Sequence, residues 1–236
     1  MNISSYNSIP SRPIAYWVSD NFINVLKKSN PLSEYGEPKK GLSTGNNDLF
    51  LRFWFEIDKS KAFFTASDYI NAFAYGSKWF PINKGGAFRK WYGNDEFVIN
   101  YENNGKEIKK FSGSVIRNET YYFNESITWS MLSSATLGAR FSSKGKLFEG
   151  AGPSLFVKKD KINYILGLIC SKIAVYFVKT FNPTLNINIA DIRNLPVVMT
   201  EKESVVSKLS NENIILSKED WDDFETSWDF KKHPLI

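Results

Sequence analysis

Residues 78–94, Lys78-Trp-Phe-Pro-Ile-Asn-Lys-Gly-Gly-Ala-Phe-Arg-Lys-Trp-Tyr-Gly-Asn94, hold five aromatic rings, four cations and three glycines, and no carboxylate. The stretch predicts short strands over 78–82 and 88–92, with turns at its glycines. Cations and flat rings attract phosphates and base edges, and glycine lets the main chain approach a partner closely. The sequence leaves open an ordinary hairpin whose rings pack inward and whose cations are solvated.

The chain around this stretch predicts an α+β fold, with a curved mixed or antiparallel sheet of short strands, one long core helix and flanking helices. The long helix is expected over 160–181, because its apolar residues form a broad stripe before Asn182-Pro183. Other helices are expected over 13–28 and from 200 to about 210. Further strands are expected at 49–57, 96–101, 120–124, 127–131, 138–142 and 153–158.

Charge divides the chain unevenly. Residues 1–200 carry 25 Lys and Arg against 16 Asp and Glu, a net charge of +9, and residues 201–236 carry 5 against 9, a net charge of −4. A basic body favours a polyanionic partner, whereas an acidic tail faces another protein or water. We therefore divide the chain into an N-terminal linker helix (1–31), a central recognition domain (32–199) and an acidic helical tail (200–236).

Residue counts argue against several kinds of chemistry. Cys170 is the single cysteine and His233 the single histidine. These counts exclude an internal disulfide framework and a multi-cysteine zinc site, and they disfavour Ser-His-Asp and Cys-His catalysis. We expect no metal site and no catalytic residue. No apolar run reaches about 18 residues and no secretion signal opens the chain, so a cytoplasmic protein without membrane contact is expected.

Two glycine motifs suggest cofactor or phosphate binding only weakly. Phe148-Glu-Gly-Ala-Gly152 matches the F-x-G-x-G pattern with which DNA methyltransferases hold S-adenosylmethionine, but Pro153 and a predicted strand follow it where that motif needs a helix. Gly41-Leu-Ser-Thr-Gly-Asn-Asn47 lacks the Gly-Lys-Ser/Thr ending of a phosphate-binding loop. A structural turn is the favoured interpretation of the second motif.

A concave DNA-binding face is predicted where residues 78–94 meet the strands at 127–131 and 138–142. Such a face would carry the side chains that contact phosphates and read base edges. The candidate DNA-binding residues are Lys78, Lys84, Arg89, Lys90, Trp91, Tyr92, Asn94, Thr128 and Arg140.

Several blocks resemble PglX-type adenine-specific DNA methyltransferases of bacterial BREX phage-defence systems, in the target-recognition region after the catalytic domain. The most specific blocks are Lys84-Gly-Gly-Ala-Phe-Arg-Lys-Trp-Tyr-Gly93 and Phe224-Glu-Thr-Ser-Trp-Asp-Phe230. The helix at 160–181 with Pro183 and Leu195-Pro196 also resembles the closing part of target-recognition domains in restriction-modification specificity subunits. One departure is Cys170-Ser-Lys172, where the related pattern has Asn-Ser-Lys.

The resemblance implies that a full-length relative binds S-adenosylmethionine and methylates adenine N6 through a Rossmann-like domain that precedes this region. This chain lacks that domain, so we expect it to be non-catalytic, to hold no cofactor itself, and to dock duplex DNA for a catalytic domain supplied elsewhere. The expected partners are double-stranded DNA and the methyltransferase catalytic domain or other defence-system subunits.

Two alternatives remain open. The chain could be a protein–protein interaction module whose acidic tail, 217–230, docks a partner subunit. It could also be a self-contained methyltransferase that uses Phe148–Gly152 to hold S-adenosylmethionine.

Overall fold

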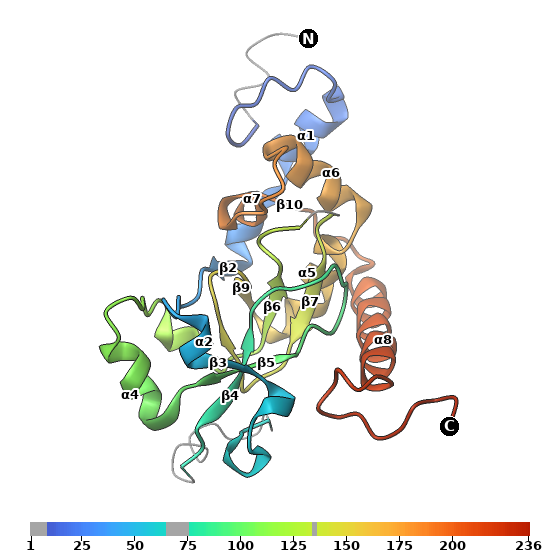
Figure 1. Cartoon of the computed structure of the whole chain (residues 1–236). Helices are drawn as coiled ribbons and strands as arrows, with labels where there is room; N and C mark the ends of the chain where they lie inside the picture. The colour runs from blue at the N-terminus through green and yellow to red at the C-terminus, as the bar shows by residue number, and fades with distance from the viewer. Residues whose placement is uncertain (1–8, 65–75, 134–135) are drawn as a thin grey trace.

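The computed structural model describes residues 9–64, 76–133 and 136–236, and this part of the chain is α+β, as the sequence predicts. An antiparallel sheet has the strand order β2-β9-β6-β7, and a mixed sheet has the order β3-β5-β4-β8 (Figure 1). In the mixed sheet only the β4–β8 pair is parallel. A two-stranded antiparallel ribbon, β1-β10, lies near the N-terminal helix.

The elements have the following bounds. The strands are β1 (Asn30–Pro31), β2 (Gly36–Lys39), β3 (Leu51–Phe53), β4 (Trp79–Asn83), β5 (Phe97–Asn100), β6 (Ser126–Trp129), β7 (Ala139–Ser142), β8 (Leu147–Phe148), β9 (Ser154–Val157) and β10 (Pro196–Val197). The α-helices are α1 (Asp20–Lys28), α2 (Asn47–Phe50), α4 (Glu102–Lys110), α5 (Ile162–Ile169), α6 (Lys172–Phe181), α7 (Ile189–Arg193) and α8 (Glu203–Asp222).

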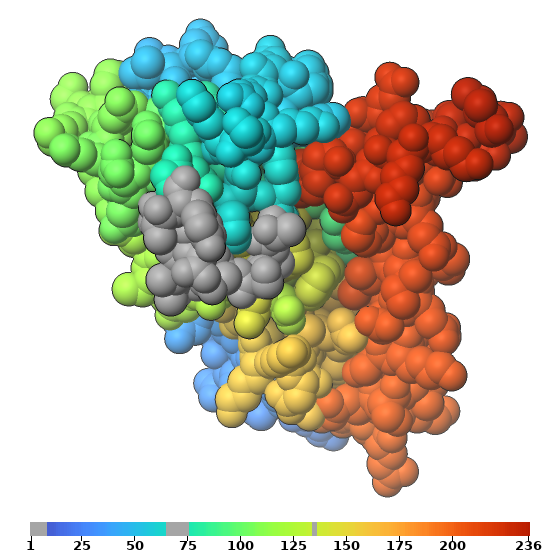
Figure 2. Space-filling view, turned by 90° about the horizontal axis from the view of Figure 1, so that it is seen from below, coloured from blue at the N-terminus to red at the C-terminus, as the bar shows by residue number. Residues whose placement is uncertain are grey.

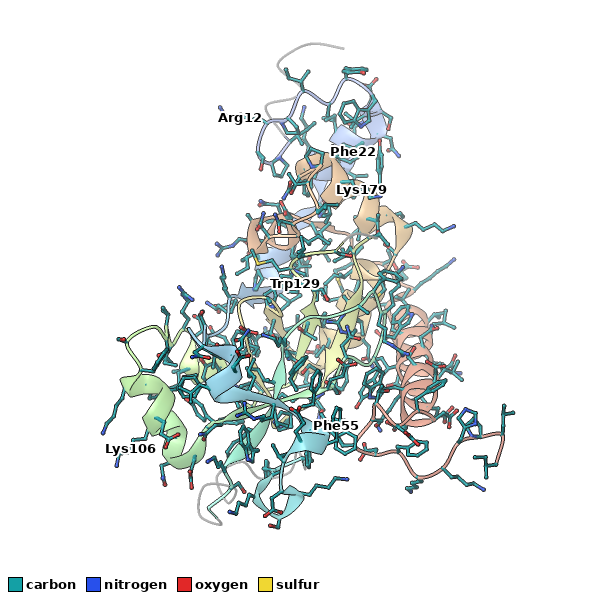
Figure 3. All side chains as sticks on the ribbon, viewed as in Figure 1. Arg12, Phe22, Phe55, Lys106, Trp129 and Lys179 are labelled. Carbon is teal, nitrogen blue, oxygen red and sulfur yellow. The ribbon has the colours of Figure 1, made fainter. Side chains whose placement is uncertain are left out.

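Two apolar cores stabilise the molecule. In the antiparallel sheet, Ile127 and Trp129 of β6 share a core with buried residues of α5 and α6, and Trp129 lies near the centre of the molecule (Figure 3). The mixed sheet builds a second core around Phe80, Ile99 and Tyr101. Successive residues of a strand point to opposite faces of its sheet. When one residue enters the core on one face, the next residue along the strand therefore points to the other face.

Between the two sheets, polar side chains meet beside the rings of Phe148 (β8) and Phe156 (β9), whose centroids are 5.3 Å apart. Asn83 at the end of β4 donates through Nδ2 to Ser142 Oγ at 2.9 Å and to Ser154 Oγ at 3.4 Å, and all three side chains are buried. Thr128 Oγ1 donates to the carbonyl oxygen of Pro153 at 3.0 Å. The sheets therefore meet through specific hydrogen bonds, which fix their relative position more narrowly than apolar packing alone.

Five of the expected strands are present with small shifts, at β4, β5, β6, β7 and β9, and 49–57 forms only the short β3. Two predictions are wrong. Residues 88–92 form a loop with one isolated bridge at Trp91, and 120–124 contain a 3₁₀ turn, η5 (Glu119–Tyr121). In both segments residues adopt a left-handed backbone, Trp91 at φ 72° and Phe123 at φ 66°, which interrupts strand pairing.

The helices also differ from the prediction. The expected helix over 160–181 is two helices, because the 159–169 segment and α6 are bent by 74° at a break where Ser171 Oγ caps α6 by accepting from the Ala174 N–H at 3.1 Å. The first helix begins only at Asp20, after its cap Ser19, and the polar helix extends to Asp222. Among the described residues, no single helix has the length and apolar composition of a membrane span. The 159–169 segment and α6 have that length and composition only when the two are counted together across their bend.

Gly41 tests the packing between the two sheets. A β-carbon at Gly41 would lie 1.9 Å from the carbonyl oxygen of Phe148, so backbone would have to move. We expect Gly41→Ala to lower the free energy of unfolding by about 3 kcal/mol in chemical denaturation. Gly150→Ala is the matched control, because its nearest neighbour is the flexible Lys40 Cε at 3.0 Å, and we expect it to cost less than about 1 kcal/mol. Equal losses for the two variants would contradict this packing.

Candidate nucleic-acid interface

Residues 84–95, which we call the basic loop, connect β4 to the residues before β5. Gly85, Gly86 and Gly93 have φ values of 88°, 123° and 111°, which non-glycine residues rarely adopt. Asn94 Nδ2 donates to the carbonyl oxygen of Ala87 at 2.7 Å and closes the loop on itself. The loop therefore has a defined shape that its glycines make possible.

Arg140 of β7 lies next to the basic loop. The Trp91 N–H donates to the Ala139 carbonyl and the Phe141 N–H donates to the Trp91 carbonyl, both at 2.8 Å, so Trp91 brackets Arg140. Arg140 is 2% exposed, and its Nε and Nη1 have no hydrogen-bond partner among the residues that the structure describes. Burial lowers the pKa of Arg140 to about 10, an effect that Asp95 partly opposes. The guanidinium therefore stays charged at neutral pH with donors unused.

A buried ion pair holds the end of the loop. Lys146 Nζ lies 2.5 Å from Asp95 Oδ2, and the two side chains are 4% and 8% exposed. Lys146 Nζ also lies 5.7 Å from the ring centroid of Tyr92, and Lys218 Nζ of α8 lies 5.4 Å from the same ring. Burial, together with the nearby carboxylate of Asp95, raises the pKa of Tyr92 far above its usual range. Tyr92 is therefore a neutral, packed ring.

The C-terminal segment, residues 217–230, packs against the basic loop. Arg89 Nη1 lies 3.2 Å from Asp220 Oδ2, and its guanidinium carbon lies 4.8 Å from the ring centroid of Trp221. Trp221 is 4% exposed, and a β-carbon at Gly93 would lie 3.0 Å from Trp221 Cε3. The carboxylate of Asp220 and the ring of Trp221 in the acidic tail therefore contact a loop of the same chain.

The same segment also contacts residues next to the strands of the mixed sheet. Trp54 Nε1 donates to the Thr226 carbonyl at 2.9 Å, and Trp228 lies 5.0 Å from Phe64 between ring centroids. Lys146 Nζ lies 5.6 Å from the Trp228 ring. In Figure 2 the C-terminal residues, in red, lie beside the cyan segment that contains Trp54. The C-terminal segment thus joins the basic loop to β3 and its turn.

The structure brings most of the predicted site residues together. Arg89, Lys90, Trp91, Tyr92, Asn94 and Arg140 all lie in or directly beside the basic loop, and Lys84 opens it. Thr128 on β6 is the register partner of Arg140, with its hydroxyl bonded to the Pro153 carbonyl, whereas Lys78 lies at the opposite end of β4. Tyr92, Thr128 and Arg140 are buried, whereas Lys78, Lys84, Arg89, Lys90, Trp91 and Asn94 are partly exposed.

The loop cations have partners within the chain. Lys84 Nζ lies 2.9 Å from Glu149 Oε2, and Lys90 Nζ donates to the Cys170 carbonyl at the end of α5 at 2.6 Å. A cation at this position is favourable, because helix C-terminal carbonyls carry partial negative charge. The Cys170 thiol itself is buried, which raises its pKa to about 11, so it behaves as a core residue.

Sequence reasoning missed the residues that hold the loop. Asp95, Lys146 and Lys218 were not predicted to act there, and Trp221 was assigned to a tail that faces a partner or solvent. The available signal was complementarity, because a loop without carboxylates and an acidic, ring-rich tail occur in one chain. No spacing rule connects segments about 130 residues apart, so the pairing itself was not predictable.

The segment Phe148–Gly152 does not form a cofactor-binding turn. It leads into β9, whereas an F-x-G-x-G motif needs a helix N-terminus. A β-carbon at Gly152 would lie 2.6 Å from the Asn83 carbonyl oxygen, so this glycine serves close backbone packing. These residues do not fit S-adenosylmethionine, and we derive no chemistry from them.

The buried ion pair gives a stability prediction. Asp95→Asn leaves the Lys146 ammonium buried without a counter-charge, and we expect the free energy of unfolding to fall by about 3 kcal/mol in urea denaturation. Replacing both residues, as Asp95→Leu with Lys146→Met, removes the charges together and should recover at least half of that loss. A double variant as unstable as Asp95→Asn would contradict the assignment of a buried ion pair.

Substitutions at Trp221 and Asp220 distinguish the contribution of ring packing from that of charge in the contact between the C-terminal segment and the basic loop. We expect Trp221→Ala to lower the free energy of unfolding by about 3 kcal/mol, because it empties a buried site. The Asp220 side chain is 62% exposed, so Asp220→Asn should change the free energy of unfolding by less than about 0.5 kcal/mol. Thermal and urea unfolding of the two variants measure the difference. A larger effect for Asp220→Asn would show that the ion pair, and not the ring, holds the segment.

No family model matches the chain. Two curated proteins are similar to 99% of it: the adenine-specific methyltransferase BrxX of Escherichia coli O9:H4 (strain HS), 40% identical over 241 residues, and the adenine-specific methyltransferase PglX of Lacticaseibacillus casei (strain Zhang), 37% identical over 243 residues. The chain spans about a fifth of the length of these relatives, 19% and 20%. The predicted resemblance is thus confirmed: along its whole length the chain is related to one part of the PglX-type adenine-specific methyltransferases.

Proposed function

We propose that this chain is the DNA-binding target-recognition part of an adenine-specific (N6) DNA methyltransferase of a phage-defence or restriction-modification system. It docks duplex DNA for a catalytic domain that lies outside the chain and binds S-adenosylmethionine there. The relatives that match the whole chain carry the name adenine-specific methyltransferase and are about five times longer, which supports a part without its own reaction centre.

The state of Arg140 is the observation that carries the proposal. A buried guanidinium with unused donors costs stability, and buried polar groups without partners are rare in folded proteins. Such local inconsistencies are concentrated at functional sites. The planar fork of arginine matches guanine O6 and N7, or a pair of phosphate oxygens. A DNA ligand at the basic loop would give Arg140 a partner for the donors that stay unused within the described part of the chain.

The loop supplies the motion that this contact needs. Arg140 is covered by the basic loop, and Gly85, Gly86 and Gly93 give that loop main-chain freedom at both ends. When the loop lifts, Arg140 faces the ligand, while Trp91 and Asn94 lie at the edge of the opening. Thr128, the register partner of Arg140 on β6, keeps the floor in place from below because it is buried and bonded to the Pro153 carbonyl.

The partly exposed cations have a different role. Lys78, Lys84, Arg89 and Lys90 contact phosphates, which position the duplex without reading its sequence. The present partners of Lys84, Arg89 and Lys90 are Glu149, Asp220 and the Cys170 carbonyl, and they are exchanged for phosphate oxygens. The net charge of +9 over residues 1–200 favours this exchange.

A salt titration tests the proposal. We expect the chain to bind duplex DNA in a gel-shift assay with roughly micromolar affinity that falls steeply with salt. Arg89→Ala should reduce the slope of log affinity against log salt by about 1, since one phosphate contact is lost. Lys179→Ala is the control, because Lys179 is an exposed cation on α6 at the other end of the molecule (Figure 3). Absence of salt-sensitive binding to every duplex tested would refute the function.

Arg140→Met gives a second test with opposite effects on stability and binding. Methionine removes the desolvated charge, so the free energy of unfolding should stay equal or rise. The affinity for DNA should fall about tenfold or more, as expected for the loss of a bidentate contact. A variant that is destabilised and binds DNA normally would make Arg140 a purely structural residue.

An interaction module is the second candidate function. Part of the C-terminal segment still faces solvent, including Phe224, which is 46% exposed, and the carboxylates of Glu219 and Glu225. Deleting residues 201–236 would not separate the two functions, because Trp221 packs against the basic loop. Phe224→Ala with Glu225→Gln is the cleaner test: loss of partner capture with unchanged DNA binding would assign this surface to a protein partner.

A further inference from the structure

A second aromatic surface lies outside the predicted DNA-binding residues. Phe53, Phe55 and Phe97, which we call the phenylalanine stack, form a ladder of rings. The centroids of Phe53 and Phe55 are 5.2 Å apart with an interplanar angle of 5°, and those of Phe53 and Phe97 are 4.6 Å apart at 29°. Phe55 is 62% exposed and Phe53 36% exposed, and Figure 3 shows Phe55 on the lower side of the molecule, near the C-terminal segment.

The stack is held in place by the backbone. Phe53 and Phe97 are register partners of β3 and β5. The Phe53 N–H donates to Glu56 Oε2 at 2.9 Å, which fixes the turn η3 (Trp54–Glu56). Trp54 packs edge-on against Phe55 and is anchored by its bond to Thr226. Exposed rings fixed in this way lose little conformational entropy when a ligand stacks on them.

An open pocket of about 330 Å³ is lined by Phe53 and Phe97 of the stack, whereas Phe55 lies outside its lining and stacks on the Phe53 ring. Arg52 and Lys84 contribute cations to its wall, and Asp48 and Glu56 contribute carboxylates, so the local charge is balanced. Arg52 Nη1 donates to the Asp48 and Leu51 carbonyls at 2.5 and 2.6 Å, which presents a planar guanidinium beside the rings. Balanced charge with flat rings suits a neutral planar group better than a phosphate.

We propose that the phenylalanine stack binds an unpaired nucleobase of the docked nucleic acid. The inference rests on the proposed function, which supplies the nucleic acid, and adds a site that recognises a base and not the backbone. One face of the base stacks on the phenylalanine rings. The in-plane donors of Arg52 and the amide of Asn47 lie at the pocket wall, where they meet the base edge.

The test compares two labelled duplexes by fluorescence anisotropy. One carries a bulge of three unpaired thymidines, and the other carries three abasic residues at the same place. We expect the wild-type chain to bind the thymidine bulge about 5- to 150-fold more tightly, the effect of one stacked base. Phe55→Ala should abolish this preference and leave the salt slope unchanged, whereas Phe55→Trp should retain the preference. Tyr16→Ala, which removes a ring 76% exposed in the N-terminal part of the chain, is the control and should have no effect.

A second readout locates the contact. With 5-iodouracil in the bulge, ultraviolet irradiation should crosslink the base to the tryptic peptide 53–59, which holds Phe53 and Phe55. If the chain binds no nucleic acid, both the function and this inference fail. If it binds both duplexes equally, and crosslinks map outside 53–59, the proposed function stands and the stacking site is overturned. A crosslink on 53–59 together with loss of preference in Phe55→Ala would support it.

Discussion

The contact between the basic loop and the C-terminal segment organises this structure. At its centre the ammonium of Lys146 and the carboxylate of Asp95 form a buried ion pair under Tyr92, and Trp221 closes the loop from outside. A buried pair of this kind adds little net stability, but removing one partner is costly. The ion pair therefore specifies the arrangement of the loop and the mixed sheet more than it stabilises the chain, whereas the buried Trp221 ring contributes stability.

This arrangement explains how the molecule can hold Arg140 in an unfavourable state. The guanidinium lies at the junction of the two sheets, beside Trp91, with Nε and Nη1 unpaired. The apolar cores on either side and the hydrogen bonds of Asn83 determine the position of β7. Their stabilisation offsets the free-energy cost of burying the Arg140 guanidinium. The loop that covers Arg140 is rich in glycine and is held mainly by side chains, which makes it the part of the interface best suited to exchange partners.

Local patterns in the sequence predicted those parts of the fold that depend on neighbouring residues. β4, β5, β6, β7 and β9 lie close to the expected positions, because bulky residues bounded by turn signals specify them. The incorrect predictions have two causes, which are contacts between distant segments and the capping of a helix. Trp91, which has a left-handed backbone, forms its backbone hydrogen bonds with Ala139 and Phe141 of β7. Ser171 caps a new helix at a point where the apolar stripe of the sequence continues without interruption. Most site candidates lie around one loop, but neither the burial of Arg140 nor the docking of Trp221 follows from spacing.

Hydrogen–deuterium exchange of the chain, with and without duplex DNA, tests the central claim most directly, since it reports on each segment of backbone. The account predicts that DNA changes the exchange of residues 84–95 and of the C-terminal segment 217–230 that packs on them, while α1 and α6 stay the same. Changes confined to α1 and α6, or no change at DNA concentrations that saturate binding, would contradict it.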